Sequence, residues 1–283
     1  MKRLLLSVLG IAASFGAAHA TTVVLDDTFT EASRTGTINA PTSTPWWNSG
    51  SPASQLTLNT AAHILDYLPN SSPLFGSIPI QTLAVNSSLT LSLTFTVIGN
   101  TTATASGLRL GLFNAGGNPV GADGTGQTNA MYQTYAGYGA FVDLGAASSN
   151  TSQIVERISN ASPALFTSGA SVQLGTTTGA APDLSAGTPY TLTLQITRDT
   201  ATKNTVTLSV NGVTFSDDDS VGITTSFDTV ALFGSVGSAS KISFSEIQVS
   251  YDAVPEPPAA ALVGAAALLL LAATRLRSAR ARA

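Results

Sequence analysis

Strict alternation of apolar and polar residues is the feature that most constrains the fold of this chain. Residues 89–97 place Leu, Phe or Val at every odd position and Thr or Ser at every even one. Residues 190–197 and 206–210 repeat the pattern. Because side chains along a β-strand point alternately to opposite faces, each stretch predicts a strand with one buried face. Asn211-Gly212 accepts positive φ, so it predicts a tight hairpin leading into a strand that continues through Phe215.

The same pattern recurs near the end of the chain, with one interruption. Ile242 and Phe244 share a face, and Ile247, Val249 and Tyr251 resume the pattern after a one-residue shift in phase. This shift predicts a β-bulge near Ser245–Glu246. Shorter strands are expected at 23–29, 55–58, 108–113, 140–144, 154–158, 171–174 and 230–233. No segment between 21 and 253 carries a helical period for more than two turns, so the body should be all-β.

About a dozen short strands without internal repeats predict an all-β, antiparallel two-sheet sandwich. A β-helix is the alternative, and unequal strand spacing disfavours it. Residues 188–213 resemble the centre of a laminin-G or concanavalin-A-like jelly roll. There, Tyr-x-Leu-x-Leu-x-Ile at 190–196 pairs with Val-x-Leu-x-Val-Asn-Gly at 206–212. The resemblance implies a jelly-roll body and, for some relatives of that fold, a structural Ca²⁺ ion.

Residues 1–20 are typical of a secretory signal peptide. Lys2 and Arg3 precede an apolar stretch at 4–11, and Ala18-His19-Ala20 has the small-x-small pattern of a cleavage site. We therefore expect signal peptidase to act on this segment and Thr21 to begin the mature protein. The body would then span residues 21–253.

Residues 254–283 combine three features in a fixed order. Pro255-Glu256-Pro257 comes first, an uncharged stretch follows to Thr274, and the basic residues Arg275, Arg277, Arg280 and Arg282 close the chain. A helix over about 258–274 would be about 27 Å long, close to the bilayer core of about 30 Å. The arginines should remain on the cytoplasmic side. The two prolines disfavour helix before them, which leaves an extended peptide outside the membrane.

This order resembles the PEP-CTERM sorting domain of exported proteins in Gram-negative bacteria. The resemblance implies that an exosortase, a cysteine-dependent membrane enzyme, processes the chain near the motif. It also implies anchoring in the inner membrane during sorting, followed by location at the cell surface or in the extracellular matrix. A plain membrane anchor is the alternative interpretation of the same segment.

Charge excludes some classes of partner. With Lys2, Arg3 and the four tail arginines set aside, six basic residues face 16 acidic ones, a formal charge of about −10. A body of this sign repels nucleic acid and anionic lipid. The chain has no cysteine, so disulfides and thiol chemistry are absent.

The sequence does not predict an enzyme. His63 is the one histidine after the signal peptide, and no G-x-S-x-G nucleophile motif accompanies it. Concanavalin-A-like glycosidases carry Glu-x-Asp-x-x-Glu on one strand, and Glu31, Glu156 and Glu246 do not begin that spacing. No catalytic residue and no cofactor are predicted.

Two weaker hypotheses concern ligands. Asp217-Asp218-Asp219 could contribute oxygen ligands to a structural Ca²⁺ ion, although a solvated acidic loop is the alternative. Trp46, Trp47, Tyr132, Tyr135 and Tyr138 could bind extracellular polysaccharide, or they could cap the core. The first interpretation is therefore a non-enzymatic exported surface protein. The alternatives are a lectin-like carbohydrate-binding module and, last, a polysaccharide-degrading enzyme.

Overall fold

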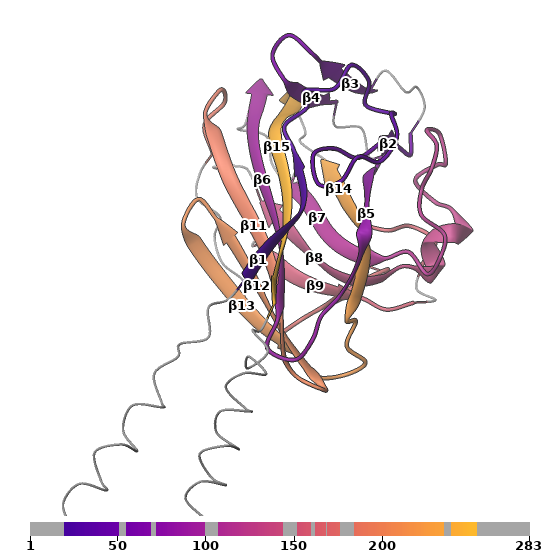
Figure 1. Ribbon diagram of the computed structural model, residues 1–283, viewed down its shortest axis with the longest axis vertical. Coiled ribbons are helices and arrows are strands. Elements are labelled where there is room, and N and C mark those ends of the chain that lie inside the picture. The colour runs from indigo at the N-terminus through magenta and orange to yellow at the C-terminus, as the bar shows by residue number, and fades with distance from the viewer. Residues whose placement is uncertain are drawn as a thin grey trace, which may run out of the picture. The chain divides into compact units, whose positions relative to one another are not determined.

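Two antiparallel β-sheets form the body of the protein in a computed structural model (Figure 1). Thr21–Asp252 makes up one compact unit. The all-β, two-sheet architecture expected from the alternating pattern is confirmed. The structure describes residues 20–50, 55–68, 72–99, 107–143, 152–159, 162–167, 169–175, 184–234 and 239–253.

The eight-stranded sheet follows the order β13-β12-β11-β6-β15-β4-β3, with β1 also paired to β15. Its strands are β1 (Ala20–Asp27), β3 (Leu56–Asn59), β4 (Ile64–Tyr67), β6 (Ser88–Gly99), β11 (Pro189–Thr200), β12 (Lys203–Val210), β13 (Val213–Asp219) and β15 (Ala239–Ala253). Burial alternates residue by residue along β6 and β12. One face of this sheet is therefore buried, while Thr, Ser and other polar residues occupy its outer face.

The seven-stranded sheet follows the order β10-β9-β8-β7-β14-β5-β2. Its strands are β2 (Trp46–Asn48), β5 (Leu74–Thr82), β7 (Gly107–Asn114), β8 (Ala136–Asp143), β9 (Gln153–Arg157), β10 (Val172–Gln173) and β14 (Ser226–Gly234). One short 3-10 helix, η2 (Ala130–Thr134), precedes β8.

The main core lies between the two sheets. Side chains such as Leu91 and Phe95 on β6, Leu194 on β11, and Leu110 and Leu232 from the facing sheet are fully buried there. Burial of this apolar surface is the dominant favourable contribution to folding, at about 25 cal/mol per Å².

The predicted hairpin and bulge are both present. Asn211 and Gly212 have φ angles of 47° and 85°, as a two-residue turn with the twist of the strands requires. The pairing of β15 with β6 shifts register between Phe244 and Glu246. The extra residue lets Phe244 and Ile247 both enter the core, although three positions separate them.

The sequence patterns did not predict β2, β4 or β5. Strand β5 carries Pro79 and a nearly continuous apolar run, and most of its first half is buried on both faces. A strand covered on both sides loses the alternation on which the predictions depend.

The predicted targeting segments lie outside the described residues. This applies to the signal peptide except Ala20, where β1 begins, and to the whole tail with Pro255, Glu256, Pro257 and its four arginines. The helix expected at about 258–274 also lies outside the described residues. Within the described part of the chain, no helix is long and apolar enough to cross a bilayer.

Candidate binding site on the outer face of the seven-stranded sheet

Arg109 occupies the outer face of the seven-stranded sheet between two aromatic neighbours. It lies opposite Phe233 on β14 and opposite Phe141 on β8. Cross-strand neighbours are close enough for side-chain contact. The guanidinium carbon accordingly lies 4.7 Å from the Phe141 ring centroid and 5.0 Å from that of Phe233. Two cation–π contacts thus hold the guanidinium on this face.

The next row of this face has almost no side chains. Ala231, Gly111 and Gly139 are paired directly across β14, β7 and β8. A Cβ at Gly111 would come within 2.5 Å of the Phe113 ring, so the ring fills the space above the glycine. The missing side chains leave room for aromatic residues that arrive from outside the sheet.

A second apolar cluster fills that room. Tyr132 stacks on Phe75 at 5.4 Å, Tyr135 meets Phe75 edge-on at 6.2 Å, and Phe166 meets Phe113 edge-on at 5.9 Å. The tyrosines come from η2 and the residue after it, and Phe166 comes from the 162–170 segment. We call residues 115–135, together with the described residues between 162 and 170, the cover. The bridge between Thr128 and Ala164 joins its two parts.

Arg157 attaches the cover to the sheet from below. It is 1% exposed, and its Nη1 and Nη2 groups donate to carbonyl oxygens at 2.5 to 3.4 Å. The acceptors are the carbonyls of Tyr132, Ser162, Ala164, Leu165 and Ala170. Burial lowers the pKa of Arg157 to about 10, which leaves it protonated at neutral pH. One buried cation therefore joins both parts of the cover.

A hollow of about 260 Å³ opens between the cover and the sheet. Arg109, Phe166 and Phe233 form its inner part, and Nη1 of Arg109 donates to the carbonyl of Phe166. The exposed residues Gln127, Thr128 and Thr167 line its rim, beside Pro73 and residues 164–165. The hollow therefore combines aromatic rings, hydrogen-bonding groups and one cation, the combination found in small-ligand sites.

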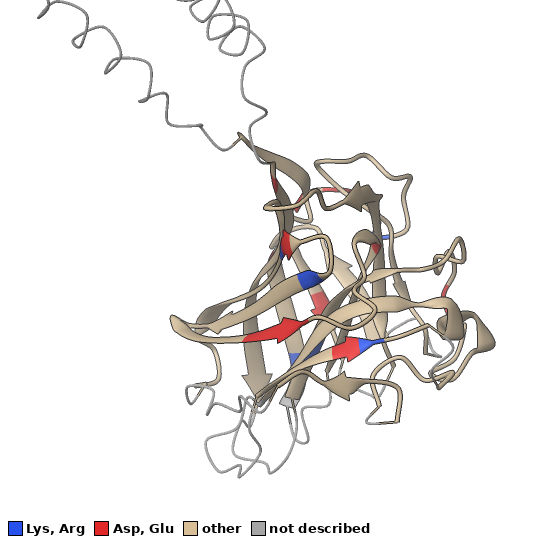
Figure 2. Cartoon of the chain, turned by 90° about the horizontal axis from the view of Figure 1, so that it is seen from below, with Lys and Arg blue, Asp and Glu red and all other residues tan. Residues whose placement is uncertain are grey.

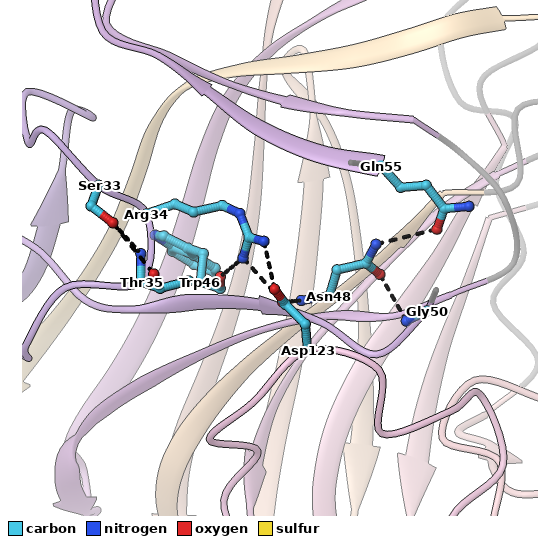
Figure 3. A network of polar contacts seen from close by, with 8 residues as sticks. All are labelled: Ser33, Arg34, Thr35, Trp46, Asn48, Gly50, Gln55 and Asp123. Carbon is cyan, nitrogen blue, oxygen red and sulfur yellow. Dashed lines mark hydrogen bonds and ion pairs between the residues drawn. The ribbon is translucent and has the colours of Figure 1, made fainter. Parts of the chain in front are cut away.

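A polar network holds the loop that precedes β2 (Figure 3). Nη1 and Nη2 of Arg34 donate to Asp123 at 3.0 and 2.6 Å, and Nη1 also donates to the carbonyl of Trp46 at 2.7 Å. The backbone N–H of Asn48 donates to the same carboxylate at 2.8 Å. Burial acts to raise the pKa of Asp123, but the bonds from Arg34 and Asn48 outweigh it and hold that pKa below its usual value.

We predict that Asp123→Ala lowers the free energy of unfolding by about 2 to 3 kcal/mol, because it removes three hydrogen bonds to a charged group. Since folding depresses the pKa of Asp123, its contribution is present above about pH 4 and is lost on further acidification. Urea unfolding at pH 7 and pH 3 measures both effects. The more exposed Asp218→Ala is the control and should change stability much less. Equal effects of the two substitutions would contradict the prediction.

A second polar cluster lies inside the sandwich. Tyr138 donates to Asp219 at 2.6 Å, and Asn204 donates to the Tyr138 hydroxyl at 2.9 Å. Glu156 is 6% exposed, and its Oε1 has no hydrogen-bond partner, nor has Oδ2 of Asp217. Burial first, and then the charge of Asp219, raises the pKa of Glu156 to about 7. Burial and the same carboxylate also raise the pKa of Tyr138.

The aromatic residues predicted to bind glycans mostly lie in the cores. Trp46, Tyr132, Tyr135 and Tyr138 are at most 1% exposed, so their ring faces contact protein. Nε1 of Trp46 donates to Asp27 at 2.8 Å, and the hydroxyls of Tyr132 and Tyr135 donate to carbonyls of the cover. Trp47 is half-buried against the second cluster. The four buried rings therefore pack in the cores, which agrees with the alternative interpretation that they cap the core.

The three adjacent aspartates do not converge. Asp218 lies on the outer face of β13, where it pairs with Lys203 at 2.8 Å, while Asp217 and Asp219 are buried on the other face. Alternation along the strand is the cause. Within the described ranges, no group of three or more His, Asp or Glu side chains is placed to hold a metal ion. His63 lies in the exposed turn between β3 and β4, with φ of 52°.

The sequence gives only a weak indication that Arg109 belongs to a functional site. In the sequence it is one arginine inside an apolar strand, Leu108-Arg109-Leu110. Its importance depends on Phe141 and Phe233, which are brought beside it by strand pairing alone. The Gly and Ala residues of the neighbouring row likewise carry no separate sequence signal.

Comparison with known proteins identifies no family. No family model matches the sequence, and no curated protein matches it. Among solved structures, an endo-1,3-beta-glucanase from Streptomyces sioyaensis is 12% identical with a TM-score of 0.48, covering 82% of this chain and 96% of its own. The lectin UEA-II complexed with galactose is 13% identical with a TM-score of 0.46, covering 83% and 99%.

The Emp46p carbohydrate recognition domain, in a metal-free form, is also similar. It is 13% identical with a TM-score of 0.47, covering 72% of this chain and 87% of its own. All three likenesses are distant. The fold described above therefore rests on the strand pairing of this chain, and its function has to be argued from its own residues.

Proposed function

We propose that this protein is an exported, non-catalytic β-sandwich of jelly-roll type that binds saccharide in the hollow beside Arg109. The observation that carries the proposal is the composition of this hollow. Phe166 and Phe233, which are 4% and 9% exposed, line it, and Gln127, Thr128 and Thr167 lie at its rim. Sugar rings bind through apolar contact with aromatic side chains together with a few oriented hydrogen bonds.

The same hollow favours binding over hydrolysis. Glycoside hydrolysis uses a pair of carboxyl groups on either side of the scissile bond. None of the nine described residues that line the hollow is Asp or Glu. At about 260 Å³ it is also smaller than the roughly 300 to 1,000 Å³ of sites for drug-sized ligands, which suits one sugar unit of a chain.

A glycan array probed with the full-length chain tests this function. We expect binding to a restricted set of polysaccharide fragments. The double substitution of Gln127→Ala and Thr128→Ala should weaken binding by about tenfold, which corresponds to two lost hydrogen bonds. Both residues are exposed, so stability should be retained. Thr214→Ala, on the exposed part of β13, is the control. Absence of binding to every glycan would refute the proposal.

A second function concerns delivery and rests on the sequence of the tail. We infer that Pro255-Glu256-Pro257, the apolar segment after it and the terminal arginines form a sorting signal for an exosortase, after signal peptidase has cut behind Ala20. The order of these elements supports it. Replacing residues 255–257 with alanines should leave an unprocessed, membrane-bound chain, detected by mass spectrometry of the C-terminus. Processing and surface delivery identical to those of the natural chain would contradict it.

A further inference from the structure

Arg109 and Arg157, the two arginines on the outer face of the seven-stranded sheet, differ from half of the body's basic residues in their ion pairing. Figure 2 shows that charged residues are sparse on the sandwich. Of the six basic residues between 21 and 253, Arg34, Lys203 and Lys241 form ion pairs with aspartates. Among the side chains that the structure describes, the other three, Arg109, Arg157 and Arg198, have no carboxylate within ion-pair distance, and of these Arg109 and Arg157 lie on the outer face of the seven-stranded sheet. The carbonyls of the 162–170 segment accept hydrogen bonds from both.

The hollow is therefore a positive site on an acidic protein. Arg109 lies inside it, and Arg157 lies below the neighbouring part of the same segment. In partly buried surroundings, a charge without a counter-ion interacts more strongly with an incoming ion than it would in water. Among the described residues that line the hollow, an anion would find one half-buried guanidinium, two hydroxyls, one amide and no competing carboxylate.

The geometry of Arg109 favours one kind of anion. Phe141 and Phe233 contact the guanidinium, which limits its side-chain freedom before any ligand arrives. Nη1 bonds to Phe166, and the described residues provide no acceptor for the other N–H groups. A planar guanidinium with free N–H groups matches the two oxygens of a carboxylate. A single such group suits one negative charge per bound unit, while the net charge of the body disfavours densely charged polyanions.

Building on the saccharide-binding function above, we propose that the hollow selects a sugar unit that carries a carboxylate, as in a uronate-containing polysaccharide. The carboxylate bonds to Arg109. The sugar ring lies against Phe233 and Phe166, and its hydroxyls reach Gln127, Thr128 and Thr167. An acidic polysaccharide is thereby distinguished from a neutral one of the same shape.

Calorimetric titration of the full-length chain tests the selectivity. The probes are a trimer of galacturonate and a neutral galactose trimer of the same linkage. We expect the acidic trimer to bind at least tenfold more tightly, and its affinity to fall as NaCl rises. Arg109→Gln should abolish the preference, and Arg109→Lys should keep part of it. Arg198→Gln is the matched control, because Arg198 lies on the other sheet and its side chain donates only to carbonyls.

The outcomes separate this inference from the function on which it rests. Equal binding of both trimers, unaffected by Arg109→Gln, would overturn the carboxylate selectivity and leave saccharide binding intact. Binding of neither trimer, nor of any arrayed glycan, would overturn both. Inorganic phosphate is a third probe. If it binds at Arg109 as tightly as the acidic trimer does, the site recognises free anions and the inference is wrong. Thermal unfolding of each variant shows whether it is folded.

Discussion

Arg157→Met is expected to lower the free energy of unfolding by about 3 kcal/mol, because Arg157 on β9 joins both parts of the cover to the sheet. The change removes five donated hydrogen bonds and leaves buried carbonyls without partners, at a cost of about 1 to 3 kcal/mol for each one that water cannot reach. Relief from burying a charge without a carboxylate partner offsets part of this loss. Urea unfolding at pH 7 measures the net change.

The loss should begin in the cover. Hydrogen exchange is expected to increase first in residues 162–167 and 169–175 and in η2, while β6 and β11 in the other sheet stay protected. Arg198→Met removes a guanidinium that also donates to carbonyls, but two of those three bonds are solvent-exposed, so this control should cost far less. Unchanged or increased stability of Arg157→Met would show that the guanidinium does not hold the cover.

Glu156→Gln is expected to stabilise the protein at pH 8 by up to about 3 kcal/mol and to have little effect at pH 4. The pKa of Glu156 is raised from its ordinary value of 4.5 to about 7 in the folded protein, mainly by burial and then by Asp219. Between these two pH values the unfolded chain releases a proton that the folded chain retains. Stability therefore falls as pH rises from about 4.5 to 7 and stays lower above that range.

The magnitude follows from the size of the pKa shift, at about 1.4 kcal/mol per unit. Glutamine removes the charge that forms near Asp219, while Tyr138 keeps its hydrogen bonds with Asp219 and with Asn204. Chemical unfolding from pH 4 to pH 9 should thus show a flatter profile for the variant. Glu246→Gln, on the outer face of the other sheet, tests whether loss of any glutamate has this effect. Parallel profiles for Glu156→Gln and the natural chain would exclude the explanation.

Both substitutions concern neighbouring residues on β9, yet they act on opposite sides of one sheet. Glu156 faces the main core and Arg157 faces the cover. In the sequence they are an adjacent pair of opposite charges. Strand alternation separates the two side chains, so neither neutralises the other, and each is buried in a different environment. The sequence shows the sign of each charge, but only the assembled sheets determine which face each side chain occupies.

The central strands of the eight-stranded sheet could be predicted from the sequence because water covers their outer face. Contact with water selects Thr and Ser at alternate positions of β6, β11 and β12, and this selection is visible as a period of two. The Asn211-Gly212 turn and the bulge in β15 were also predictable from local sequence. The turn requires residues that accept positive φ, and the bulge shifts the phase of the apolar alternation by one residue. Together these features determined an all-β sandwich.

Several strands of the seven-stranded sheet were predicted, but its buried outer face and its site depended on tertiary structure. Its outer face is covered by a second apolar cluster, so β5, β9 and β14 are buried on both sides and their alternation is largely lost. For the same reason, Tyr132 and Tyr135 could be recognised as aromatic but not as buried. The hollow beside Arg109 exists because segments far apart in the chain meet over one row of glycine and alanine, and a row that crosses three strands has no signature along a single one.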